Sequence, residues 1–488
     1  MNYKRFFSVS ALVFSISATA NQEQKMIAER LNDQRIQTEN TVTQIPPAAS
    51  PKKAAPPSAQ EKAKSISMTK EELAKHPDLV VRALIPAVLQ GNAETVELLY
   101  PIYQKIPTQY HDAVLTKWAE AILAKKAGNY SQSVKLYREI MAKNANIPQA
   151  RFQLAVGLFE NNELEAAEDQ FKKLRSDTKI AEEQELMDKF LSAIARRDRW
   201  TFHAGLTYLN DPNINNAPKA GTRYGNWIGP KRESAEGVGF NLGIGKKWSW
   251  GDGFFNELRL NGNGKYYWDN EKFNEVTGRG SVGIGFQNAT FSVALLPFME
   301  QTLYAGGTRL SDTLRRFSKA GGATLETNYW LTPKWQLSGN YEYAEQRYTN
   351  RKHLNGNYHF VSAGIAYLAS AQQYWFVNLN YNRTATRDKD DSFFRRGINV
   401  GWGQEWGKGL STRFSISLVQ KRYKGPMPIF GITQRNKEYG FQASIWHRAL
   451  HWKDITPRLT YHFTRTRSNH VFYSYDKHRI FVEFTKQF

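Results

Sequence analysis

The segment Ile480-Phe481-Val482-Glu483-Phe484-Thr485-Lys486-Gln487-Phe488 ends the printed sequence with an alternating pattern. Ile480, Val482 and Phe484 fall on one face, followed by Lys486 and Phe488, and the other face is mostly polar. An alternating strand of this length that ends in an aromatic residue is typical of the closing strand of a bacterial outer-membrane β-barrel. We therefore predict that Ile480, Val482, Phe484 and Phe488 form a barrel-assembly signal.

Similar alternating segments follow one another from Trp200 to this last strand. In one of them Trp375, Val377 and Leu379 alternate with Asn378 and Asn380. About fourteen such segments can be counted, and antiparallel closure favours an even number. A soluble sandwich alternates in the same way, but tryptophans near the strand ends favour membrane interfaces. The sequence therefore predicts a 14-stranded antiparallel transmembrane β-barrel over residues 198–488.

The region 68–197 has a helical pattern instead, with apolar residues three and four positions apart. Similar residues recur 34 positions apart, as Tyr137 and Phe171 do, and as Ala121 and Ala155 do. A 34-residue helix-turn-helix period is typical of tetratricopeptide (TPR) repeats. The alternative is an unrelated pair of helical hairpins. We predict an all-α TPR-like domain here, so the fold class is α+β multidomain.

The N-terminal residues have the features of a segment directed to export. Lys4 and Arg5 precede an apolar run, and Ala18-Thr19-Ala20 offers a cleavage site, so residues 1–20 are predicted to be a signal peptide. Residues 21–67 are polar and proline-rich, which predicts a disordered tether. We expect the barrel in the outer membrane and the helical domain in the periplasm.

Charge and side-chain chemistry restrict the possible functions. The net charge is +21, and removing Lys4 and Arg5 lowers it by two. This charge favours anionic lipid, lipopolysaccharide or an acidic client, and export argues against nucleic acid. There are no cysteines, and His447 and His451 flank a strand end. Asp388, Asp390 and Asp391 lack the pattern of a calcium loop. We predict no enzyme, no metal and no cofactor.

Several motifs resemble one known family. They are SIWHRALHWKDITPRLT at 444–460, WGQEWG at 402–407, TPKWQ at 332–336 and the closing FVEFTKQF at 481–488. These segments are similar to the Slam family, the surface lipoprotein assembly modulators, and the similarity extends over about residues 80–488. The resemblance implies an outer-membrane translocon of the type XI secretion class. Its clients would be surface lipoproteins or secreted haem- or iron-binding proteins with a C-terminal barrel-like domain.

The resemblance suggests a role for each domain. The repeats would capture the client. If the 34-residue register is right, the first helix of each pair lines the concave surface, so Trp118, Lys125, Phe152 and Phe159 are candidate contacts, although ordinary packing between helices is the alternative. The barrel would provide the route, and the barrel assembly machinery and outer-membrane lipid are further expected partners.

A different class of function remains as the runner-up. A TPR-barrel exporter of an anionic polysaccharide would suit a lumen lined by Arg395, Arg413, Arg458 and Arg465. The resemblance decides against this reading. A passive porin ranks third because it needs no repeat domain.

Overall fold

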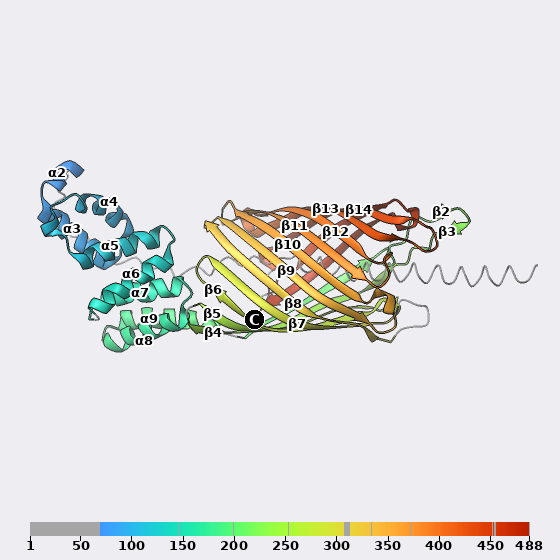
Figure 1. The fold of residues 1–488 in the computed structure, drawn as a ribbon, viewed down its shortest axis with the longest axis horizontal. Coiled ribbons are helices and arrows are strands. Elements are labelled where there is room, and N and C mark those ends of the chain that lie inside the picture. The colour runs from blue at the N-terminus through green and yellow to red at the C-terminus, as the bar shows by residue number, and fades with distance from the viewer. Residues whose placement is uncertain are drawn as a thin grey trace, which may run out of the picture.

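The computed structural model describes residues 69–487 apart from 145, 199, 252, 307–312, 333, 371, 451, 453 and 454. The predicted signal peptide, the predicted tether and Phe488 lie outside the described residues. A helical domain precedes a closed barrel of fourteen antiparallel strands (Figure 1). The predicted α+β multidomain fold class is therefore confirmed. No helix in the described ranges has the length and apolarity needed to cross a bilayer.

The helical domain is a series of antiparallel helix pairs. Aspartate and asparagine side chains begin several of its helices, because their oxygens accept hydrogen bonds from otherwise unpaired backbone N–H groups. The Asp112 carboxylate, for example, accepts from the N–H groups of Val114 and Leu115. The α-helices are α2 (Lys70–Ala74), α3 (Pro77–Gln90), α4 (Ala93–Tyr103), α5 (Ala113–Lys126), α6 (Tyr130–Lys143), α7 (Pro148–Glu160), α8 (Leu164–Asp177) and α9 (Ala181–Arg197).

The 34-residue spacing reappears in the core of this domain. Ala121 and Ala155 are fully buried, where small side chains let the helices approach closely. Tyr137 and Phe171 are also buried at corresponding places on α6 and α8. The Phe171 ring stacks on Phe190 of α9, with 4.5 Å between ring centroids. The repeat pattern thus becomes a continuous core shared by neighbouring helix pairs.

We expect Phe171→Ala to lower the free energy of unfolding of the helical domain by about 3–5 kcal/mol, because it leaves a cavity. Thermal unfolding followed by the helical circular dichroism signal measures the change. Leu98→Ala is the matched control, because Leu98 is exposed on α4, and its effect should stay within about 0.5 kcal/mol. Equal losses from both variants would contradict the assigned core.

The barrel strands begin at Thr201 and are mostly longer than ten residues. They are β1 (Thr201–Asp211), β4 (Ala235–Gly251), β5 (Phe254–Tyr267), β6 (Glu275–Gln287), β7 (Phe291–Tyr304), β8 (Arg315–Thr332), β9 (Trp335–Tyr348), β10 (Gly356–Leu368), β11 (Gln373–Thr386), β12 (Phe393–Glu405), β13 (Leu410–Pro426), β14 (Thr433–His447), β15 (Arg458–Ser468) and β16 (Tyr475–Gln487). A small hairpin, β2 (Arg223–Tyr224) and β3 (Trp227–Ile228), lies in the first long loop.

Side chains of each barrel strand alternate between the outer surface and the interior. On β11, Leu379 is 53% exposed, whereas Asn378 and Asn380 are each 8% exposed. The exposed set is largely apolar because it faces lipid, and the inward set contains the buried polar side chains together with some aromatic ones, such as Phe376. This alternation places the polar chemistry of the barrel inside it.

The barrel closes between its first and last strands. Five residue pairs join β1 to β16, from His203 with Gln487 to Thr207 with Glu483. By contrast, all eleven residues of β1 pair with β4. The β1–β16 ladder is therefore the short link that removes the free edges of the sheet, and backbone groups facing lipid need such pairing.

Deleting residues 484–488 would remove four of the five β1–β16 pairs. We expect the truncated chain to remain in the periplasm or to be degraded, because both terminal strands would then expose unpaired backbone to lipid. Membrane fractionation combined with heat-modifiable mobility in gels checks this. A chain lacking the helical residues 69–197 serves as control and should still assemble. Normal assembly of the chain that lacks residues 484–488 would refute the predicted assembly signal.

Candidate functional site

Hydrogen bonds between neighbouring helices of the helical domain converge on Gln153 of α7. Its carboxamide oxygen accepts hydrogen bonds from Trp118 Nε1 at 2.8 Å and from the Tyr137 hydroxyl at 2.6 Å. Its Nε2 donates to the backbone oxygens of Val88 and Leu89 at 3.0 and 3.1 Å. One side chain therefore ties the end of α3 to α5, α6 and α7.

This arrangement also explains the glycine that follows α3. Gly91 has a φ of +65°, which favours a residue without a side chain, and it ends the helix. A Cβ atom at this position would lie 3.2 Å from Gln153 Nε2. The C-terminal end of α3 and the Gln153 side chain of α7 are therefore in close contact.

The four predicted client contacts lie near one another on α5 and α7, but not all of them are accessible. Trp118 is 4% exposed and Phe159 is 2% exposed, so both belong to the core. Phe152 is half-buried against Phe171 and Phe190. Lys125 forms an ion pair with Glu160 at 3.0 Å. Their role in client binding stays a prediction, with Lys125 and Phe152 the better placed of the four.

Gln153 itself was missed by the sequence analysis. From the sequence alone, Gln153 resembles a solvent-facing polar position, like Gln149 on the same helix. Its spacing of 35 residues from Trp118 was a weak signal, because it lies within one residue of the repeat length. Only the packing of several helices shows that this side chain has four partners.

The helical domain is attached to one part of the periplasmic rim of the barrel. The Asp198 carboxylate accepts hydrogen bonds from the Ser249 backbone N–H at 2.8 Å and from its hydroxyl at 2.9 Å. Lys246 donates to the Asp198 backbone oxygen. Farther along the rim, Asn162 Nδ2 donates to the Asn288 backbone oxygen at 2.7 Å. These contacts hold α8 and α9 beside β4 and the β6–β7 turn, as Figure 1 shows.

The interior wall contains matched charges. The Glu342 carboxylate, which is almost fully buried, accepts from Arg279 at 2.8 Å, from the Thr324 hydroxyl at 2.9 Å and from the Tyr358 hydroxyl at 2.6 Å. Arg259 pairs with Glu257 at 2.8 Å and with Glu326 at 2.9 Å. Buried charges need such partners, and the result is a lumen wall that is polar and largely neutralised.

Three of the four predicted lumen arginines face the interior. Arg395 pairs with Glu438 at 2.9 Å. The Arg413 guanidinium lies 4.9 Å from the centre of the Phe376 ring, and that of Arg458 lies 4.5 Å from the centre of the Trp446 ring. Whether these arginines contact a transported molecule stays a prediction.

The prediction that Arg465 lines the lumen is wrong. The strand register aligns Arg465 with Tyr439 and Leu418, which are exposed on the outer surface. Residues an odd number of positions apart on a strand point to opposite faces. Because Arg458 points inward, Arg465 on the same strand points outward.

Near the external loops, β1 and β16 are connected by side chains and not by backbone pairing. Within the described part of the chain, Tyr208–Asp211 pair with β4 but form no ladder with β16. Asp211 Oδ2 lies 3.0 Å from Lys477 Nζ, and both side chains are buried. This ion pair therefore bridges the seam where its backbone pairing has ended.

Three external loops pack together at the end of the barrel away from the helices. Trp227 from β3, Phe430 and Phe472 meet there in an apolar cluster. The His470 ring is fully buried beside the Tyr224 and Phe430 rings. Burial lowers the pKa of His470, so its ring remains neutral at pH 7. The cluster connects the first long loop to the loops that follow β13 and β15.

The loop that follows β11 brings three carboxylates together. One oxygen from each of Asp388, Asp390 and Asp391 falls within 4.8 Å of the others. Asp391 also lies 3.9 Å from His353 Nε2. Acidic groups gather in exposed loops without binding an ion, so the predicted absence of a metal stays a prediction.

A closed fourteen-stranded barrel with a lipid-facing apolar surface and an attached repeat domain defines a class of outer-membrane protein. Two family models match the chain. "Surface lipoprotein assembly modifier" covers residues 200–488, and its "N-terminal TPR repeats" cover residues 66–171. The chain therefore belongs to the surface lipoprotein assembly modifier family. It lies in the outer membrane, with its helical domain in the periplasm.

Individual proteins support this assignment. The chain is 48% identical to surface lipoprotein assembly modifier 1 of Haemophilus influenzae over 87% of each chain. It is 23% identical to the hemophilin secretion modulator of Acinetobacter baumannii, over 85% of this chain and 86% of that protein. Among solved structures, the toluene transporter TodX of P. putida is similar at 12% identity and a TM-score of 0.34, covering 60% of this chain and 90% of TodX. That likeness is too weak to bear on transport.

The seam ion pair generates a prediction about barrel stability. Asp211→Lys or Lys477→Asp alone should cost about 3–5 kcal/mol, because each leaves uncompensated buried charge. The double exchange should recover much of that loss. The temperature at which the folded band disappears in gels measures the effect. Glu345→Lys, which breaks an exposed pair with Arg347, should cost no more than about 1 kcal/mol. Additive losses in the double exchange would contradict the pairing.

Proposed function

We propose that this protein is an outer-membrane translocon that moves client proteins from the periplasm to the cell surface. The observation that carries the proposal is a periplasmic repeat domain fixed to the rim of a closed, polar-lined barrel. The named relatives act in surface lipoprotein assembly and in hemophilin secretion. Surface lipoproteins and secreted haem-binding proteins are therefore the two client classes that we propose.

The helical domain is proposed to capture the client before it enters the barrel. Its attachment through Asp198 and Asn162 places α8 and α9 at the rim over β4 and the β6–β7 turn. A client bound to these helices would start next to the periplasmic opening, which raises its effective concentration there. Lys125 and Phe152 are the proposed contacts that remain partly accessible.

The barrel is proposed to provide the route along its inner wall. An unfolded polypeptide presents many backbone donors and acceptors, so it needs a polar and hydrated path. The lumen offers such groups on most of the strands, including Asn378 and Asn380 of β11. Several of its charged residues are paired across the wall, as Arg279 is with Glu342, which lowers the net attraction that a passing chain of either charge would meet.

The paired charges also weigh against the polysaccharide exporter. That function would need several lumen cations free to bind an anionic polymer, whereas Arg395 is held by Glu438 and Arg259 by two glutamates. We also propose that the client carries a C-terminal barrel-like domain, and that the barrel assembly machinery inserts this protein. The family is named for assembly, so we propose no enzymatic activity.

Deleting residues 69–197 should sharply reduce the surface display of a co-expressed client, because the capture surface is lost while the barrel strands remain. Flow cytometry and protease accessibility measure display, and the barrel abundance is the control. The charge-reversed variant Lys125→Glu/Glu160→Lys keeps the ion pair but removes the cation that is proposed to contact the client. It should therefore reduce display, whereas normal display would show that the ion pair is only structural. If a host without this protein displays the client equally well, the translocon proposal fails.

A further inference from the structure

The outer surface of β12–β15 carries a concentration of cations near the external loops. The strand register aligns Arg396, Gln420, Lys437 and Arg467 in one row across these four strands. One row nearer the loops, Arg422 is aligned with Arg435. All five cations are exposed. We call them the outer cationic face: Arg396, Arg422, Arg435, Lys437 and Arg467.

The outer cationic face lies at the extracellular edge of the apolar, lipid-facing surface of the barrel. Two residues closer to the periplasm, Leu418 is aligned with Tyr439, and both are exposed, whereas the same row continues on β15 with the exposed Arg465. Ile416 and Phe441 form the next row in the same direction. Because outward rows that are apolar face the acyl chains, the cations lie at the level of the headgroups of the outer leaflet.

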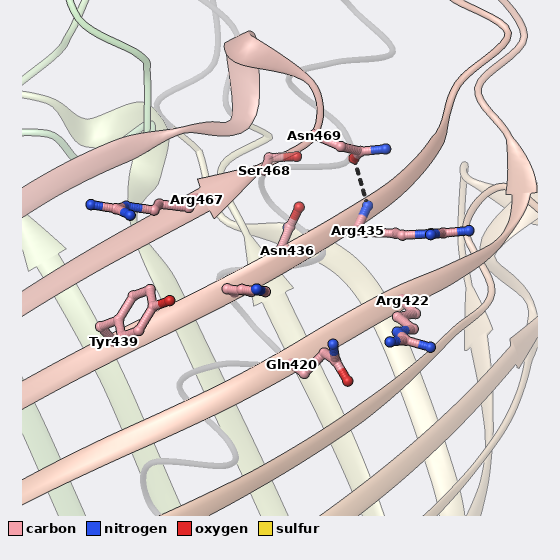
Figure 2. Close-up of a pocket in the computed structure, with 9 residues that line it drawn as sticks. Gln420, Arg422, Arg435, Asn436, Tyr439, Arg467, Ser468 and Asn469 are labelled. Carbon is pink, nitrogen blue, oxygen red and sulfur yellow. Dashed lines mark hydrogen bonds between the residues drawn. The ribbon is translucent and has the colours of Figure 1, made fainter.

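The outer cationic face surrounds a groove. Its volume is about 490 Å³, and its lining includes Gln420, Arg422, Arg435, Tyr439 and Arg467. Figure 2 shows Arg422, Arg435 and Arg467 on three neighbouring strands, with Gln420 on the same strand as Arg422. The Arg435 backbone N–H donates to Asn469 Oδ1 at 2.8 Å, which ties the external loop to the edge of the groove.

No acidic side chain of the described strands β12–β15 faces these cations. Glu405 lies at the periplasmic end of β12, and Glu438 points inward to Arg395. On β9, by contrast, the outward Arg347 pairs with Glu345 at 2.6 Å. Neighbouring strands are about 4.8 Å apart, so the cations repel one another unless an external anion lies between them.

We propose that the outer cationic face binds the phosphorylated headgroup of an outer-leaflet glycolipid of the lipid A type. Arginine forms paired, charge-assisted hydrogen bonds with phosphate. The side-chain amide of Gln420 supplies groups for sugar hydroxyls, and Leu418 and Tyr439 supply a surface for acyl chains. Two rows of cations above an apolar row match a ligand that joins several anionic groups to acyl chains. This binding is independent of the proposed transport.

The test uses the purified full-length chain in detergent, with lipid A carrying both phosphates as the probe. Native mass spectrometry measures the bound fraction during titration. Lys437→Gln/Arg467→Gln removes two cations that are aligned on the adjacent strands β14 and β15. This variant should weaken binding at least about tenfold, because charge-assisted hydrogen bonds are lost. Lys319→Gln/Arg347→Gln removes another outward register pair, on β8 and β9, and should change binding less than about twofold.

The exchanged variant Lys437→Arg/Arg467→Lys keeps both charges and should bind nearly as well as the original chain. Heat-modifiable mobility confirms that every variant is folded. Equal binding by the original chain and both glutamine variants would overturn the proposal. It would also be overturned if phosphatidylglycerol or inorganic phosphate displaced lipid A at equal concentration, because the site would then recognise any lipid phosphate or any free anion.

Discussion

Closure of the sheet between β1 and β16 is the constraint on which the rest of the structure depends. A barrel in lipid cannot leave backbone N–H and C=O groups unpaired at an edge. Five residue pairs meet this need near the periplasm, and the Asp211–Lys477 ion pair bridges the seam toward the outside. The strand alternation then follows, because closure fixes which face of each strand meets lipid and which meets the lumen.

Charge is distributed differently on the two sides of this wall. Inside, carboxylates hold several of the arginines, as Glu342 holds Arg279 and Glu438 holds Arg395. Outside, the cations near the external ends of β12–β15 face no acid from those strands. A matched interior suits the passage of polypeptides of varied charge, whereas an unmatched exterior suits an anionic membrane surface. Part of the high positive net charge of the sequence is therefore concentrated on the outer surface, near the external ends of β12–β15.

Much of this architecture could be predicted from local patterns. Period-two alternation, exemplified by Leu379 and Asn380, revealed the strands, and the 34-residue spacing of Tyr137 and Phe171 revealed the repeats. Other features depend on contacts between distant segments. The four partners of Gln153 come from three other helices, and the short β1–β16 ladder depends on the register between Thr207 and Glu483. Arg465 faces outward because it lies an odd number of positions from the inward Arg458 on the same strand. The presence of an arginine in a strand does not by itself show which face it lies on.

The most direct test of the account asks which face of the barrel a client touches during transport. A photo-crosslinking amino acid would replace the inward Asn380 in one strain and the adjacent, outward Leu379 in another. A client stalled by a folded C-terminal fusion would hold the route occupied during illumination. The account predicts that the client crosslinks at position 380 and not at position 379. Crosslinks at position 379 alone, or at neither position while display continues, would contradict a route through the lumen.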